Sequence, residues 1–290
     1  MSSTSDARPA SQSAVPDTQR PDDSYPSVAE PIIGVEHLTI GYGQKVLMRD
    51  LNFEVRRGEV FVILGGSGSG KSTLLKHMIG LYRPMHGHIR LHGKDIVAAE
   101  GEARLAILRR IGVTYQSGAL FGSMTLAENV RLPLEEYTDL PDRAMELIAL
   151  MKLDLVGLKD FAPSLPSEVS GGMQKRAAMA RAMALDPDIM FLDEPSAGLD
   201  PVTSADLDLL ILRLAQTLGM TFVVVSHELP SVFTIADRAI MLDRSTRTIA
   251  ACGPPKELRD HSDNPVVRQF FNRQPSVSAD DMTRPAGIGA

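Results

Sequence analysis

A glycine-rich stretch that ends in lysine and two hydroxyl residues is the strongest chemical signal in this sequence. Its members are Gly65, Gly66, Ser67, Gly68, Ser69, Gly70, Lys71, Ser72 and Thr73. The stretch fits the pattern G-x-x-x-x-G-K-[ST], in which glycines let backbone N–H groups surround a phosphate. Lys71 would bring a positive charge to the outer phosphates, and Ser72 would offer a hydroxyl ligand to Mg2+. A plain glycine-rich turn is the alternative, and the flanking strand and helix patterns argue against it.

The apolar run 189–192 ends in two adjacent carboxylates, Asp193 and Glu194. We expect these side chains to point to opposite sides, because successive residues alternate along an extended chain. Asp193 then suits the position that holds Mg2+ beside Ser72, and Glu194 suits a general base for an attacking water. Both acids would also fit as caps of the turn at Pro195, but the glycine loop favours the metal and base roles.

His227 and Gln116 also follow apolar or β-rich runs. Nucleotide sites of parallel sheets form at the carboxyl ends of strands, where we expect both residues to lie. We predict that His227 contacts the γ-phosphate and that Gln116 reaches Mg2+ or the attacking water. Without the glycine loop, a structural role for His227 would be the better reading, and the signal from Gln116 alone is weak.

A second anion-binding helix start is expected at Ser170, Gly171 and Gly172, which open an alanine-rich helical pattern. The first turn of a helix presents unpaired N–H groups and a positive dipole end. A chain with two such sites but one lysine-bearing loop suggests that the two meet across a dimer. The alternative is an ordinary helix with Ser170 as its N-cap.

Strand and helix patterns place these residues in an α/β domain. The apolar run 60–64 precedes the glycine loop, and a helical pattern follows it over 74–79. Apolar runs at 189–192 and 221–225 flank a helical pattern at 204–218. This β–helix–β order indicates a parallel sheet with crossover helices.

The folded domain is expected to span residues 32–272, with a mostly helical insert at about 117–184. Residues 1–31 are rich in Ser, Pro, Asp and Thr and show no periodicity, so we predict a disordered tail. Residues 273–290 also lack a pattern and are predicted to form a flexible tail.

Composition excludes several classes of protein. The net charge of −6 gives no basic field for nucleic acid, so no nucleic-acid partner is expected. No apolar run approaches the ~18 residues of a membrane span. Cys252 is the only cysteine, which excludes internal disulfides and cysteine-cluster zinc sites.

The ordered set of motifs resembles the ATP-binding subunits of ABC transporters over roughly residues 33–272. The set comprises the glycine loop, Gln116, Val-Ser-Gly-Gly-Met at 169–173, Phe-Leu-Asp-Glu-Pro at 191–195, Ser-Ala-Gly-Leu-Asp at 196–200 and His227. The resemblance implies a P-loop NTPase core with a mainly parallel sheet, an antiparallel β subdomain and a helical insert. It also implies ATP and Mg2+ as cofactors and ATP hydrolysis as the reaction.

The same resemblance implies a head-to-tail homodimer that closes on two ATP molecules. Each site would pair one subunit's glycine loop with Ser170, Gly171 and Gly172 of the other subunit. Asp200 would lie in a segment that communicates between the two sites. Tyr42 would stack on adenine, although a tyrosine packed locally in a hairpin turn is the alternative.

One residue that differs from the usual family motif, together with two further sequence runs, points to a branch of this family. Most relatives carry Gln where this chain has Met173, while the Ser-Gly-Gly residues are intact. The run Gln-Ser-Gly-Ala-Leu-Phe at 116–121 and the apolar run 264–271 resemble the ATPases of Mla-type systems. Those ATPases work with MCE-domain proteins to move phospholipids between membranes.

We therefore predict an ATPase subunit, peripheral at the cytoplasmic face of a bacterial inner membrane, that drives lipid transport with a permease and an MCE-domain partner. The permease is expected to contact the surface near 116–133. Two alternatives stay open. One is a non-transport ABC ATPase that regulates an envelope complex, and the other is the ATPase of a polar-solute importer. A simple phosphate-loop kinase would not need the Ser-Gly-Gly motif.

Overall fold

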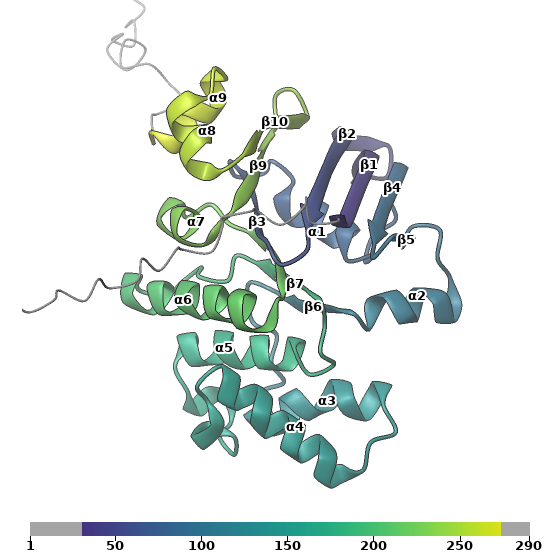
Figure 1. The fold of residues 1–290 in the computed structure, drawn as a ribbon, viewed down its shortest axis with the longest axis vertical. Coiled ribbons are helices and arrows are strands. Elements are labelled where there is room, and N and C mark those ends of the chain that lie inside the picture. Colours follow the sequence, from purple (N-terminus) through teal and green to yellow (C-terminus); the bar gives the residue numbers. More distant parts are fainter. Residues whose placement is uncertain (1–30, 274–290) are drawn as a thin grey trace, which may run out of the picture.

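The computed structural model describes residues 31–273, and the two expected tails lie outside this range except for Pro31 and Arg273. Two sheets organise the fold (Figure 1). The larger sheet has six strands in the order β10-β9-β3-β8-β7-β6. Its strands are β3 (Val60–Gly65), β6 (Ile111–Thr114), β7 (Ile189–Asp193), β8 (Thr221–Val225), β9 (Arg238–Asp243) and β10 (Thr248–Gly253).

The five strands from β9 to β6 run parallel, and β10 pairs antiparallel with β9 at the edge. The central strands are buried on both faces, as expected for a sheet covered on two sides. The expected parallel sheet with crossover helices is therefore confirmed, and all five parallel strands present their carboxyl ends at one edge of the sheet.

The smaller sheet is antiparallel and has the order β2-β1-β4-β5. It comprises β1 (Pro31–Tyr42), β2 (Lys45–Arg56), β4 (His86–Leu91) and β5 (Lys94–Asp95). Its apolar side chains share one core with α1 (Lys71–Met78) and with one face of the larger sheet, where Phe61 and Ile63 point.

The opposite face of the larger sheet, which includes Val62 and Leu64, shares a second core with the remaining long helices. These are α3 (Leu126–Tyr137), α4 (Asp142–Leu155), α5 (Gly171–Ala182) and α6 (Pro201–Leu218). The shorter helices are α2 (Gly101–Leu108), η1 (Lys159–Phe161), η2 (Pro166–Glu168), α7 (Leu229–Ile235), α8 (Pro255–His261) and α9 (Pro265–Phe271). Side chains alternate between the two faces along each buried strand, so each strand contributes to both cores.

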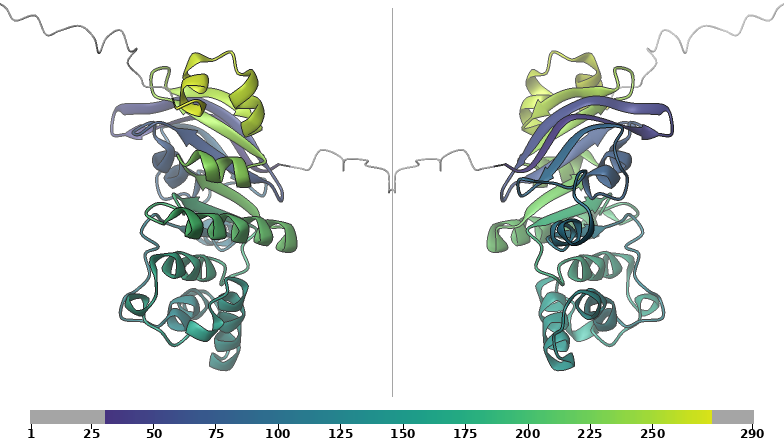
Figure 2. Two further views of the ribbon diagram at one scale, coloured as in Figure 1. Left: turned by 90° about the vertical axis from the view of Figure 1, so that its left-hand side faces the viewer. Right: turned by 90° about the vertical axis from the view of Figure 1, so that its right-hand side faces the viewer.

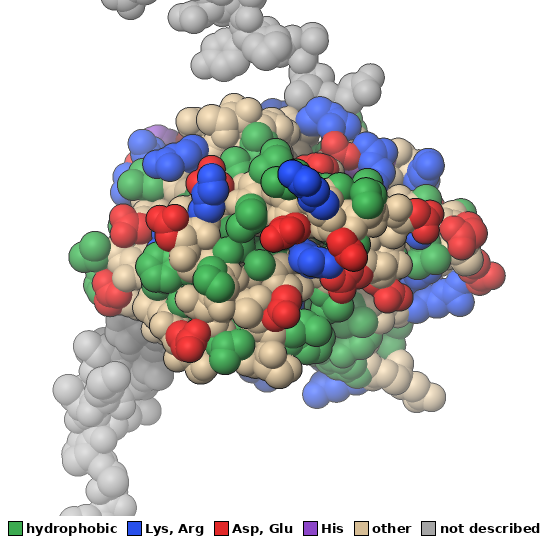
Figure 3. Space-filling view, turned by 90° about the horizontal axis from the view of Figure 1, so that it is seen from below, with side chains coloured by type: hydrophobic (Ala, Val, Ile, Leu, Met, Phe, Trp, Pro, Cys, Tyr) green, Lys and Arg blue, Asp and Glu red, His purple; other side chains and the backbone are tan. Residues whose placement is uncertain are grey.

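Helices α3, α4 and α5 lie together at one end of the molecule, and α8 and α9 lie at the other (Figures 1 and 2). Contacts of α3 with α4 and with α5 hold the helical region together. The face at this end carries apolar side chains among charged ones (Figure 3). Exposed apolar residues of the region include Tyr137, Leu140, Leu147 and Met151.

Candidate functional site

The glycine loop joins β3 to α1 and has a backbone that other residues would not tolerate. Gly65, Gly68 and Gly70 have φ values of 151°, 71° and 93°, in the region that favours glycine. A Cβ on Gly65 would lie 2.4 Å from Ser69 Oγ. Ser69 Oγ is buried and has no hydrogen-bond partner among the described residues. The backbone of the loop is therefore tightly packed around position 65 and requires glycine there.

Lys71 is the first residue of α1, so the helix begins three residues earlier than its sequence pattern indicated. Its Nζ donates hydrogen bonds to the carbonyl oxygens of Gly65 (2.8 Å) and Gly66 (3.2 Å). Burial lowers the pKa of Lys71, and the nearby carboxylates of Glu194 and Asp193 oppose that shift. The ammonium is thus positioned over the loop and faces both acids.

Asp193 and Ser72 meet across the site, although 121 residues separate them in the chain. Ser72 Oγ donates to Asp193 Oδ1 at 2.9 Å. Residues 31–273 contain no cluster of three or more His, Cys, Asp or Glu side chains that would bind a metal alone. One carboxylate beside one hydroxyl is the donor set that suits Mg2+ when phosphate oxygens complete its shell.

Glu194 and His227 form the second pair of the site. Nδ1 of His227 lies 2.8 Å from each carboxylate oxygen of Glu194. Asp193 and Glu194 do point to different partners, but strand alternation is not the reason. Strand β7 ends at Asp193, and Glu194 has a φ of 50°. A left-handed residue after the strand turns Glu194 towards His227, while Asp193 keeps its contact with Ser72.

A cavity of about 580 Å³ lies over the loop and gathers most of the expected residues. Its lining includes Gly65, Gly66, Ser67, Gly68, Gly70, Lys71, Ser72, Thr73, Gln116, Glu194 and His227. Gln116 lies two residues beyond the end of β6 and also lines a neighbouring cavity of about 470 Å³ with Asp193. A phosphate cradle, a basic side chain and a carboxylate–histidine pair therefore share one space, while the Ser72–Asp193 pair joins it to the neighbouring cavity, since Ser72 lines the first and Asp193 the second.

Residues 48–197 match the family described as "ABC transporter". The intermembrane phospholipid transport system ATP-binding protein MlaF of Haemophilus influenzae is 40% identical over 237 residues, which cover 82% of this chain and 89% of MlaF. The probable ribonucleotide transport ATP-binding protein mkl of Mycobacterium leprae is 42% identical over 240 residues, which cover 83% of this chain and 68% of mkl.

A solved dimeric structure of the ATP-binding cassette MJ0796, in a post-hydrolysis state with ADP and Pi bound, has the same fold. It superposes with a TM-score of 0.69 at 29% identity, covering 77% of this chain and 98% of that one. This chain belongs to the ABC transporter family. It is an ATP-binding ATPase subunit, as the sequence predicted, and its ABC ATPase fold is confirmed.

Several residues expected to act in this ABC subunit lie outside the main cavity. The side chain of Ser170 accepts a hydrogen bond from Met173 N at 3.3 Å, so Ser170 is the N-cap of α5. Ser170 and Gly171 are exposed, whereas Gly172 is buried against α6, where a Cβ would lie 2.4 Å from Thr203 Cγ2. The two readings of this motif are therefore compatible, because a capped helix start still presents its outer N–H groups.

Asp200 and Tyr42 also do not line the main cavity. Asp200 is the N-cap of α6 and accepts hydrogen bonds from the backbone of Val202 and Thr203, each at 3.1 Å. Tyr42 is 50% exposed at the end of β1, and its hydroxyl lies 2.9 Å from Thr73 Oγ1. The tyrosine hydroxyl is thus tied to the last residue of the glycine loop, and the ring packs edge-on near Tyr82.

Phe270 of α9 lines the main cavity and was not among the expected site residues. The apolar run 264–271 pointed to a branch of the family and not to the ATP site. Phe270 packs edge-on against Phe271, which is buried in the core near Phe233. The C-terminal helix of the described chain therefore contributes one apolar wall to the ATP cavity.

Proposed function

We propose that this chain is the ATP-hydrolysing subunit of a transporter that moves phospholipid between bacterial membranes. The observation that carries this proposal is the 40% identity that extends over 89% of MlaF. The Gln-Ser-Gly-Ala-Leu-Phe run at 116–121, which resembles the ATPases of Mla-type systems, supports it. An MCE-domain protein is the partner that this branch of the family implies.

A second candidate has its own support. The mycobacterial relative mkl is 42% identical and is named a probable ribonucleotide transport protein. This favours an importer of polar solutes as the rival function. The two candidates differ in the cargo that accompanies the membrane partner, so the cargo decides between them.

In the proposed mechanism, separate residues of the chain bind the phosphates, hold the metal and activate the water. Lys71 and the backbone N–H groups of the loop hold the outer phosphates of ATP and offset their charge. Ser72 and Asp193 would hold Mg2+, which supplies further charge neutralisation when bound. Glu194 orients a water towards the γ-phosphate and accepts its proton, while His227 fixes the direction of the Glu194 carboxylate.

The start of α5 suits an ATP site shared between two subunits. Ser170 and Gly171 are exposed and do not line the cavity of their own chain. Their N–H groups at the start of α5 suit a phosphate, so the ATP that they contact would be held by the partner subunit. We infer that two chains pack head to tail and that ATP hydrolysis requires both.

The permease is expected at the surface near 116–133. Phe121 is 51% exposed there, and a groove of about 350 Å³ lies between α2, β6 and α3, where Leu108, Tyr137 and Leu185 line it. Exposed apolar side chains that rim a groove are typical of a protein contact. A cytoplasmic helix or loop of an inner-membrane permease fits this surface.

No helix among residues 31–273 is long and apolar enough to cross a bilayer.

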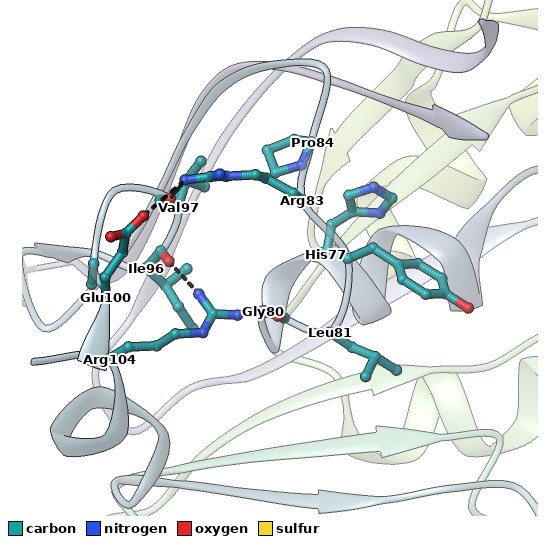
Figure 4. A pocket seen from close by; sticks show the side chains of 11 residues that line it. His77, Gly80, Leu81, Arg83, Pro84, Ile96, Val97, Glu100 and Arg104 are labelled. Atoms are coloured by element: carbon teal, nitrogen blue, oxygen red, sulfur yellow. Dashed lines mark hydrogen bonds and ion pairs between the residues drawn. The ribbon is translucent and has the colours of Figure 1, made fainter. Parts of the chain in front are cut away.

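A further recess of about 280 Å³ adjoins the C-terminal end of α1 (Figure 4). Arg104 closes it by donating to the carbonyl oxygens of Ile96 (2.7 Å) and Gly80, and Leu81 on its wall is 56% exposed. His77, also on the wall, hydrogen-bonds the carbonyl of Thr73 at 2.8 Å. The recess thus borders the helix that begins at Lys71.

The experiment that tests this function is a pull-down of the tagged chain from detergent-solubilised membranes, with proteins and lipids identified by mass spectrometry. We expect a permease, an MCE-domain protein and bound phospholipid. Recovery of a permease with a solute-binding protein and no phospholipid would favour the importer. Recovery of a division or envelope complex without a permease would favour a non-transport ATPase.

A further inference from the structure

Arg244 follows the last residue of β9 and lies beside the glycine loop. A Cβ built on Gly68 would lie 3.7 Å from Arg244 Nη1. Because a carbon–carbon bond adds about 1.5 Å, this guanidinium nitrogen lies within ~5 Å of the Gly68 backbone. Gly68 itself lines the ATP cavity. The edge of the loop therefore carries a cation in addition to Lys71.

The end of β9 is fixed against the loop, and this sets where the Arg244 side chain begins. Gly65 pairs with Leu242 in the parallel sheet, and a Cβ on Gly65 would lie 2.9 Å from the carbonyl oxygen of Leu242. Asp243 is 7% exposed and accepts hydrogen bonds from the backbone N and the hydroxyl of Ser245, each at 2.8 Å. The backbone on both sides of Arg244 is thus held in place.

The charge of Arg244 is not used within the described part of the chain. No side chain or carbonyl among residues 31–273 accepts a hydrogen bond from its exposed guanidinium. Arg238, at the start of the same strand, instead pairs with Glu59 at 3.1 Å. A guanidinium presents a planar fork of donors that matches the oxygens of a phosphate. Arg244 is therefore available to an anion that arrives with a ligand.

The strand order places Arg244 on a different flank of the loop from the groups proposed for hydrolysis. Strands β9 and β8 lie on opposite sides of β3, from which the loop emerges. His227 follows β8, and Glu194 follows β7 on the same side. The N–H groups of a phosphate-binding loop hold the α- and β-phosphates, whereas its lysine reaches the β- and γ-phosphates. Arg244 thus lies beside the phosphates that ADP retains.

We propose that Arg244 is a further phosphate-binding residue of the ATP site, which contacts the α- or β-phosphate from the β9 flank of the glycine loop. Such a contact is equally strong before and during cleavage of the γ-phosphate. It therefore stabilises bound ATP and bound ADP without lowering the barrier to hydrolysis.

The test uses Arg244→Gln, which removes the charge, and Arg244→Lys, which keeps the charge but loses the planar fork. Arg247→Gln is the matched control, because it removes the same charge from the same exposed turn. A Cβ on Gly68 would have no atom of Arg247 within 4 Å. Binding is measured in a Glu194→Gln background, where hydrolysis is expected to be slow, and turnover is measured in the otherwise native chain.

We expect the Kd values of ATP and ADP to rise together in Arg244→Gln, measured by displacement of a fluorescent ATP analogue. The rise should be about fivefold or more, as expected for one unit-charge contact at ~5 Å or closer in water. Arg244→Lys should show a smaller rise, and Arg247→Gln should stay within about twofold of its parent. The KM for ATP should rise with the Kd in Arg244→Gln, while kcat stays within about twofold.

A purely structural role is separated by thermal unfolding without nucleotide. Because Arg244 makes no described hydrogen bond, the melting temperature of Arg244→Gln should stay within about 2 °C of the parent. Unchanged Kd values in Arg244→Gln would overturn the inference. So would an equal loss in Arg247→Gln, which would indicate only the general field of the turn. A loss confined to kcat, or to ATP without ADP, would also contradict the proposed contact.

Discussion

His227 Nδ1 lies 2.8 Å from both carboxylate oxygens of Glu194. The two residues come from the ends of neighbouring strands, β8 and β7. The Glu194 side chain is 11% exposed and that of His227 is 59% exposed, so the histidine is the more accessible of the pair. The carboxylate is thus held in one direction by a group that also lines the ATP cavity.

The first prediction concerns Glu194 as the base. Glu194→Gln keeps the shape and one hydrogen bond to His227 but removes the proton acceptor, so kcat for ATP hydrolysis should fall about 10²-fold or more. ATP binding should stay within about twofold. Steady-state ATPase and nucleotide titration measure the two effects. Glu135→Gln on the exposed side of α3 is the control, and native turnover in Glu194→Gln would disprove the assignment.

The Ser72–Asp193 pair predicts a magnesium dependence. Asp193→Asn retains the size of the side chain but removes a charged ligand, so the Mg2+ concentration for half-maximal ATPase should rise about 10–100-fold. Chelation by EDTA should stop turnover in the native chain and addition of Mg2+ should restore it. A metal titration of both chains measures this, and identical titration curves would exclude Asp193 from the metal site.

Gly65 and Gly66 offer a matched test of the loop geometry. A Cβ at Gly65 would lie 2.4 Å from Ser69 Oγ at a φ of 151°, whereas a Cβ at Gly66 meets nothing within 4 Å. Gly65→Ala should lower the free energy of unfolding by about 2 kcal/mol or more, because overpacking and backbone strain add. Gly66→Ala should leave it nearly unchanged. Thermal unfolding of the two chains measures the difference, and equal melting temperatures would contradict the observed loop.

Asp208 predicts a dependence of stability on pH. It is 5% exposed on α6, and burial raises its pKa, with a hydrogen bond from Ser231 opposing and the Glu228 charge adding to the rise. The folded chain therefore binds this proton more tightly than the unfolded chain, so the stability from Asp208 falls as pH rises above the unfolded pKa of about 3.9.

Asp208→Asn removes this titration, so the variant should be more stable than the native chain at pH 7. The gap should close as the pH falls towards about 4. A difference of ~1 kcal/mol would appear as roughly 2–4 °C in melting temperature for a chain of this size. Burial also raises the pKa of Glu59. Glu59 is present in both chains, so its effect on stability cancels in the comparison. A variant that is less stable at pH 7 would contradict the account.

Local patterns in the sequence were enough to predict the main sheet and the loop. Strands such as Val60–Gly65 and Thr221–Val225 are continuous apolar runs between polar turns, and they form the buried centre of the sheet. Helix α6 begins at Pro201 rather than at residue 204. Asp200 followed by proline is an N-cap signal that was available in the sequence.

Features that depend on distant contacts or on single backbone angles were not predictable. The left-handed φ of Glu194 breaks the strand alternation, and no residue type at that position announces it. Phe270 reaches the cavity only because α9 packs beside β10 and α8. Lys175 meets Gln116 across 59 residues, a contact that tertiary packing decides. The roles assigned to single site residues remain predictions for the experiments above.

The central claim is that one complete ATP site needs two chains, and sedimentation of the Glu194→Gln chain tests it most directly. The 31.4 kDa chain should sediment as a monomer without nucleotide and as a dimer with ATP and Mg2+. Adding Ser170→Arg should abolish the dimer while a fluorescent ATP analogue still binds. A Ser170→Arg chain that dimerises on ATP as its parent does, or that hydrolyses ATP at the native rate as a monomer when Glu194 is restored, would contradict the account.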